Sequence, residues 1–117
     1  MYNVFQPYKK TIWLLLIFSA LAYSPLSKAE ILIFKLKIKG HLFFPSELEI
    51  PANTKVKLSI SNEDNTPEEF ESYELNREKV IPGKSKATVF IGPLKPGEYP
   101  FFGEFYPKTA QGKVVVK

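Results

Sequence analysis

Two stretches of strict alternation constrain the fold most strongly. In residues 32–39 and again in residues 55–60, apolar side chains take every second position and mostly lysines lie between them. A period of two is the signature of a β-strand with one buried and one solvent-facing side. The chain therefore has to form a sheet whose apolar face is covered by another layer.

The rest of the chain repeats this pattern in shorter pieces. The turn residues Pro51-Ala52-Asn53-Thr54, Pro82-Gly83 and Pro93-Leu94-Lys95-Pro96-Gly97 separate apolar segments at 43–50, 87–91, 99–105 and 114–116. Residues 68–76 fit either a helical turn or a short irregular strand. Short strands with regularly spaced turns predict an all-β sandwich or barrel. The sequence contains no cysteine, so its core has to be held by side-chain packing alone.

Residues 1–29 have the features of an export leader. Lys9 and Lys10 precede an apolar run at residues 12–22, and Ser27-Lys28-Ala29 places small residues where a signal peptidase cleaves. We expect a signal peptide at 1–29, a mature domain at 30–117 and a periplasmic location. Retention of the leader as an uncleaved membrane anchor is the alternative.

Charge gives no sign of a nucleic-acid partner. Without Lys9, Lys10 and Lys28 the mature chain has thirteen basic residues against 12 acidic ones, a net charge of about +1. Nucleic-acid binding requires a clustered basic face. The lysines instead alternate with apolar residues along strands, which we interpret as solubilising strand faces and edges.

The order of the segments resembles that of cupredoxins. Phe43-Phe44-Pro45 leads into the first strands, Asn62 ends a strand before a loop with Asp64 and Pro67, and Gly97-x-Tyr99-x-Phe101 runs through a loop to Gly112-x-Val114-x-Val116. The resemblance covers nearly the whole mature chain. It implies a monomeric, cupredoxin-like Greek-key β-sandwich.

The same resemblance excludes a blue copper site. In cupredoxins the last loop supplies Cys, His and Met ligands and an earlier loop supplies a second His. Alignment on the 99–101 strand puts those positions on Gly103, Tyr106 and Ala110, and on Glu68 or Glu69. None of these residues is a thiolate, thioether or imidazole, so thiolate-coordinated copper is not expected.

Within this fold, five motifs resemble the EfeO-type cupredoxin-like domains. They are Glu69-Phe70-Glu71-Ser72, Arg77-Glu78-Lys79-Val80, Gly92-Pro93-Leu94-Lys95-Pro96-Gly97, Phe101-Phe102-Gly103-Glu104-Phe105 and Thr109-Ala110-Gln111-Gly112. The resemblance implies a periplasmic protein of bacterial iron uptake that works with an inner-membrane iron permease or another periplasmic iron-uptake protein. That family commonly has a His where this chain has Tyr106, whose phenolate oxygen can bind ferric iron.

Five residues are candidate metal ligands: Glu69, Glu71, Glu104, His41 and Tyr106. Oxygen ligands with one imidazole suit harder ions than a thiolate site does, so the expected ion is iron or copper. Glu104, set among five aromatic rings, has an alternative as a structural ion-pair partner of Arg77 or Lys79. His41 has an alternative as a surface-loop histidine.

The other acidic residues have simpler interpretations. We expect Glu63, Glu68 and Glu74 to be solvated, and Glu78 to pair with the flanking Arg77 and Lys79.

Three functions are open at this point. The first is a periplasmic metal-binding accessory of iron uptake, which receives iron or copper and assists Fe(II) oxidation before transfer to a permease. The second is a metal-free interaction module whose aromatic and acidic end docks a partner. The third is a ferroxidase with turnover, for which a site without cysteine offers no obvious route for fast electron transfer.

Overall fold

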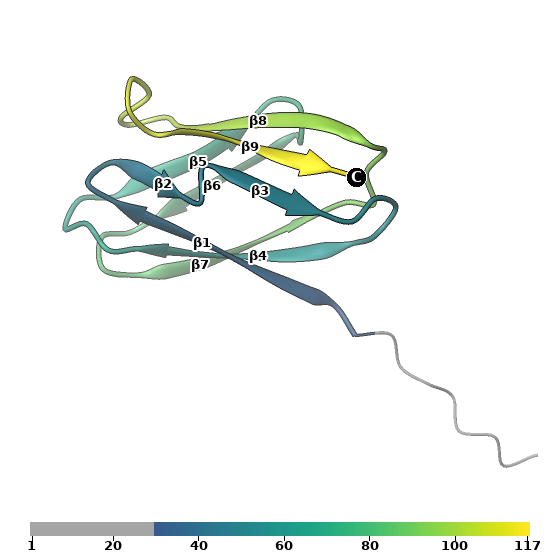
Figure 1. Cartoon of the computed structure of the whole chain (residues 1–117). Coiled ribbons are helices and arrows are strands. Elements are labelled where there is room, and N and C mark those ends of the chain that lie inside the picture. Colours follow the sequence, from purple (N-terminus) through teal and green to yellow (C-terminus); the bar gives the residue numbers. More distant parts are fainter. Residues whose placement is uncertain (1–29) are drawn as a thin grey trace, which may run out of the picture.

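The structure is a computed structural model and describes residues 30–117, which form nine strands in two layers (Figure 1). The predicted leader lies outside the described residues. The strands are β1 (Leu32–Lys39), β2 (Leu42–Phe44), β3 (Glu47–Ile50), β4 (Val56–Asn62), β5 (Glu68–Ser72), β6 (Arg77–Ile81), β7 (Lys86–Ile91), β8 (Gly97–Gly103) and β9 (Gln111–Val116). Residues 30–117 contain no helix long and apolar enough to cross a membrane.

The strands pair into two mixed sheets. Sheet A has the order β2-β1-β4-β7, with β1 parallel to β4, and sheet B has the order β3-β9-β8-β5-β6, with β3 parallel to β9. The other neighbours are antiparallel. This arrangement confirms the predicted all-β, cupredoxin-like β-sandwich.

The core lies between the sheets and follows the predicted alternation. Sheet A contributes Leu36, Ile38, Leu58 and Ile60, and every one of these side chains is buried. Phe43 on β2 of the same sheet meets Phe70 and Phe101 of sheet B in an aromatic cluster. The Phe101 ring meets the Phe43 ring edge-on, with centroids 4.9 Å apart. Residues 30–117 form a contiguous apolar core of their own.

The structure shows that residues 68–76 begin with a strand, and that the apolar segment at 99–105 is only partly buried. Residues 68–72 are strand β5, and a turn then leads into β6, so no helical turn forms here. Phe101 is 2 % exposed, whereas Phe105 is 45 % exposed. The apolar segment at 99–105 therefore leaves the core at the end of β8, because the loop after Gly103 leaves the sandwich.

The lysines lie on solvent-facing strand positions, as expected, but the two outer faces differ in charge. Register places Lys35 and Lys37 on the outside of sheet A beside Ser59 and Ser61, which in turn lie beside Thr88 and Lys86. Sheet B instead carries outward glutamates, among them Glu69 and Glu71 on β5. Alternation along each strand was predictable, but which strands would share a face was not.

The buried ring of Phe101 should carry much more of the stability than the exposed ring of Phe105. We expect Phe101→Ala to lower the free energy of unfolding by about 3–5 kcal/mol, because it removes a fully packed aromatic side chain. Phe105→Ala should change it by less than about 0.5 kcal/mol. Urea unfolding of residues 30–117 measures both, and equal losses would contradict the described core.

Candidate metal centre

Glu68 is buried in the sandwich, at the end where β5 and β8 meet the last loop. Strand β5 points Glu68, Phe70 and Ser72 inward, and the Glu68 side chain is only 1 % exposed. Its Oε1 accepts hydrogen bonds from the backbone N–H groups of Glu69 and Phe105, both at 2.9 Å. The prediction that Glu68 is solvated is therefore wrong, because Glu68 lies in strand β5 on the same inward face as Phe70.

The Glu68 carboxyl fills the space that the last loop leaves open. A Cβ atom on Gly103 would lie 2.5 Å from Glu68 Cδ and 2.6 Å from the Ala110 Cβ. Gly103 and Ala110 are the positions aligned with the Cys and Met ligands of cupredoxins. The second carboxyl oxygen, Glu68 Oε2, is buried without a hydrogen-bond partner.

This pocket does not fit a blue copper ion. It offers one carboxylate, a glycine and an alanine where such a site needs a thiolate, and a side chain at residue 103 would collide with Glu68. The residues present therefore exclude thiolate-coordinated copper, as the sequence predicted.

Glu104 lies next to this pocket but is exposed. Its backbone N–H donates to the Glu69 carbonyl at 2.9 Å, while its side chain faces outward. Within residues 30–117, the structure forms no ion pair between Glu104 and Arg77 or Lys79. Arg77 donates to the Phe90 carbonyl instead, at 2.8 Å. The interpretation of Glu104 as a wedged, ion-paired carboxylate is thus wrong.

His41 and Tyr106 come together at the loop end of the molecule. Their rings stack with centroids 3.5 Å apart, and the Thr109 hydroxyl donates to the His41 carbonyl at 2.8 Å. Gly40 and His41 both have left-handed backbone conformations, at φ of 60° and 57°. This turn is held by Asp64, whose carboxylate accepts the N–H of Gly40 at 2.7 Å and of His41 at 2.9 Å.

Asp64 fixes the His41 ring as well as its backbone. The His41 Nδ1 lies 3.5 Å from the second Asp64 oxygen. The backbone hydrogen bond from His41 is the main cause that lowers the pKa of Asp64 below its ordinary value, and the bond from Gly40 adds to it. The Asp64 carboxylate is therefore stabilised in its charged form.

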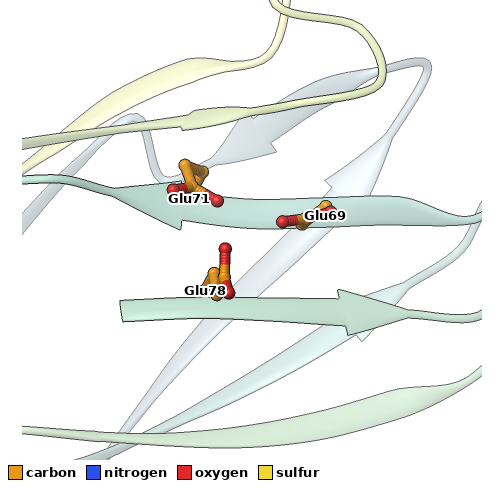
Figure 2. Close-up of side chains that lie close together, drawn as sticks. All are labelled: Glu69, Glu71 and Glu78. Atoms are coloured by element: carbon orange, nitrogen blue, oxygen red, sulfur yellow. The ribbon is translucent and has the colours of Figure 1, made fainter. Parts of the chain in front are cut away.

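Three carboxylates gather on the outer face of sheet B. Glu69 and Glu71 project from β5 toward Glu78 on β6, and one oxygen of each lies within 4.8 Å of the others (Figure 2). Glu71 and Glu78 are direct partners in the β5–β6 register. Like charges at opposed positions of a sheet are destabilising, which makes this cluster costly unless a proton or a cation offsets the charge.

Titration of the cluster reflects this crowding. Desolvation is the main cause that raises the pKa of Glu71 to about 7, followed by a hydrogen bond with Glu69 and the charge of Glu78. The environment of Glu71 therefore favours its protonated form. The same oxygens form the one grouping of three metal-ligand side chains of the His, Cys, Asp and Glu types in residues 30–117.

The five predicted ligands do not share one site. Glu69 and Glu71 form the outer carboxylate cluster, His41 stacks on Tyr106 at the loop end, and Glu104 is exposed between them. Glu78 completes the cluster and was predicted to pair with its neighbours in sequence. The sequence feature that could have identified Glu78 is a hairpin turn centred between residues 74 and 75, because such a turn places residue 78 opposite residue 71.

Comparison with known protein families shows to which family the chain belongs. The profile of the cupredoxin-like domain family matches residues 11–116. The chain belongs to the cupredoxin-like domain family. An uncharacterized protein of Rickettsia prowazekii (strain Madrid E) is 46% identical over 87 residues, which are 74% of this chain and 70% of that protein.

Solved structures show the same fold at low sequence identity. Auracyanin A, a blue copper protein of Chloroflexus aurantiacus, superposes with a TM-score of 0.64 at 12% identity, covering 75% of this chain and 100% of that one. The metal-binding domain of the Cu(I)-exporting P-type ATPase of Streptococcus pneumoniae D39 gives 0.62 at 13% identity, with 78% and 99% covered. This cupredoxin-like chain thus shares its fold with copper-binding proteins.

Loss of the Glu68 side chain should destabilise the fold. Glu68→Ala removes two hydrogen bonds and leaves a cavity beside Gly103, so we expect a loss of about 2–4 kcal/mol in the free energy of unfolding. The matched control is Glu63→Ala, since Glu63 is exposed. Urea unfolding measures the stability of both variants. A Glu68→Ala protein as stable as Glu63→Ala would show that the Glu68 side chain does not stabilise the fold.

Relief of the carboxylate cluster should stabilise the protein at neutral and alkaline pH. A folded-state pKa of about 7, above the ordinary 4.5, means that Glu71 lowers stability progressively as pH rises from about 4.5 to about 7. Glu71→Gln removes this cost and keeps an amide that can bond to Glu69. Thermal melts across this range should show equal stability at acid pH and a more stable variant at pH 8, and a pH-independent difference would contradict the raised pKa.

Proposed function

We propose that this cupredoxin-like protein is an exported metal-binding accessory of iron uptake, and that it holds iron or copper at the outer carboxylate cluster. The observation that carries the proposal is the cluster of Glu69, Glu71 and Glu78, whose oxygens lie within 4.8 Å of one another. Copper-binding proteins of the same fold support metal handling, and the resemblance to EfeO-type domains supports iron.

The chemistry of the cluster suits a hard cation in transit. Carboxylate oxygens favour ions that are harder than Cu(I), and three of them stabilise the higher charge of Fe(III) more than that of Fe(II). The site would assist Fe(II) oxidation in this way, with the iron losing one electron and dioxygen accepting it as superoxide. An open site on a sheet face also lets the ion leave toward a second protein.

The place of action in this proposal follows from the leader and the resemblance. An exported chain would meet incoming iron in the periplasm and pass it to an inner-membrane iron permease or to another periplasmic iron-uptake protein. Binding of a cation at the cluster competes with protonation of Glu71, whose pKa is raised to about 7. Metal affinity should therefore rise with pH through neutrality.

A metal-free interaction module is the second candidate function. Two observations favour it: the Glu68 side chain fills the space beside Gly103, and the loop end presents an exposed Phe105 beside the stacked His41 and Tyr106. A hollow of about 330 Å³ lies between these aromatic side chains and Thr109. In this alternative the loop end binds a partner protein, and the carboxylates of the outer cluster only keep the surface of sheet B soluble.

Metal titration of matched variants separates the two candidates. We expect calorimetric titration of residues 30–117 with anaerobic Fe(II), and separately with Cu(II), to show one site. Glu71→Gln and Glu78→Gln should each weaken binding by at least about tenfold, since each removes one charged ligand of three. Glu74→Gln is the control, because Glu74 is exposed in the turn next to the cluster.

The variants His41→Ala, Tyr106→Phe and Glu104→Gln complete the set. They should leave affinity unchanged if the metal lies on sheet B. Loss of affinity in these three variants, with full affinity in Glu71→Gln, would place the ion at the loop end. Absence of binding in the wild-type protein would overturn the proposal and favour the interaction module.

A further inference from the structure

The outer face of sheet A is strongly basic, although the mature chain is almost neutral. The lower layer in Figure 1 consists of β1, β4 and β7, and their outward positions are set by the burial pattern of each strand. Lysines occupy half of these positions: Lys35, Lys37, Lys39, Lys57 and Lys86, with Lys55 just before β4. None of the ion pairs within residues 30–117 involves these lysines.

Apolar side chains lie among the lysines on this basic face. Ile33 is 58 % exposed, and Leu42, Phe44 and Phe90 are 43–46 % exposed. The Lys37 ammonium lies 5.8 Å from the centre of the Phe44 ring, and the Lys55 ammonium 5.2 Å from that of Phe90. Four large apolar side chains exposed together on one sheet face are typical of a surface that binds a partner or a membrane.

A shallow groove on the basic face has the right chemistry for a phosphate. It has a volume of about 360 Å³ and is lined by Lys35, Lys37 and Lys86, by the hydroxyls of Ser59 and Ser61, and by Phe44. Glu63 at its edge is the one carboxylate that lines it. Ammonium and hydroxyl donors beside an aromatic ring match a phosphodiester headgroup next to its acyl chains.

We propose that the outer face of sheet A docks on an anionic phospholipid bilayer. Lysines would bind the phosphates, while Phe44 and Phe90 enter the headgroup region. Docking in this way turns sheet B, with its outward glutamates, away from the lipid, because the two outer faces lie on opposite sides of the sandwich. The divided charge would then fix the orientation of the protein at the surface.

A nucleic acid and a second copy of the chain fit the basic face less well than a bilayer does. A nucleic acid would gain nothing from the exposed Ile33 and Leu42. The acidic sheet B of a second copy is complementary in charge, but such a head-to-tail contact does not close and leads to open filaments.

Vesicle sedimentation tests the proposal with residues 30–117, which form a contiguous apolar core of their own. The protein should bind vesicles of phosphatidylcholine with about one third phosphatidylglycerol, and not vesicles of phosphatidylcholine alone. The triple variant Lys35→Gln, Lys37→Gln, Lys86→Gln should lose about a hundredfold in partitioning, at about fivefold per lysine near an anionic surface. The matched control Lys95→Gln, Lys108→Gln, Lys117→Gln makes the same charge change away from the face and should lose much less.

A second variant tests the apolar part of the contact. Phe44→Ser should weaken vesicle binding by about tenfold, and the exposed Phe105→Ser at the loop end should not.

Three outcomes would overturn the proposal. Equal losses in the two triple variants would show unspecific charge attraction. Self-association that the face variant abolishes, without vesicle binding, would assign the face to a second copy. Tighter binding to a DNA duplex than to the anionic vesicles would assign it to nucleic acid.

Discussion

The buried carboxyl of Glu68 is the contact on which the loop end of this sandwich depends. One of its oxygens accepts two backbone N–H groups, and the one from Phe105 belongs to the last loop. The loop is thereby tied to β5 by a side chain, where a copper protein of this fold would tie it through a metal ion. The absence of a side chain at Gly103 is what makes room for this arrangement.

With the Glu68 carboxyl filling the interior beside Gly103, the candidate metal ligands of this chain lie on the outside of the sandwich. With Glu68 in the interior, the remaining carboxylates of β5 and β6 lie on the outer face of sheet B, where Glu69, Glu71 and Glu78 crowd together. The raised pKa of Glu71 follows from that crowding. The fold keeps the shape of its copper-binding relatives while its candidate metal ligands lie on a different surface.

Strand positions and the fold class were predictable from the sequence, because alternation with a period of two reports burial directly. The inward direction of Phe101 and the core role of Leu36 and Ile38 follow from the same signal. The site was predictable only in part. Residues 69 and 71 share one strand face by parity and Glu68 shares the other with Phe70, but the sequence left open whether this segment is a strand or a helical turn.

Pairing between strands explains the side-chain groupings that the sequence patterns did not predict. Glu78 joins the cluster through the β5–β6 hairpin, and the lysines of β1, β4 and β7 form one face because those strands are neighbours in sheet A. Neither neighbourhood can be worked out from single-strand patterns. His41 and Asp64 meet for the same reason, across two loops that are 23 residues apart.

The central claim is that any metal ion binds on the outer face of sheet B and not at the loop end. Paramagnetic NMR tests it directly: amide signals of residues 30–117 are recorded during titration with Cu(II), which broadens the signals of nearby nuclei. The account predicts early loss of the signals of Glu69, Glu71 and Glu78, with those of His41 and Tyr106 retained. Early loss at His41 and Tyr106, with the β6 signals intact, would contradict it.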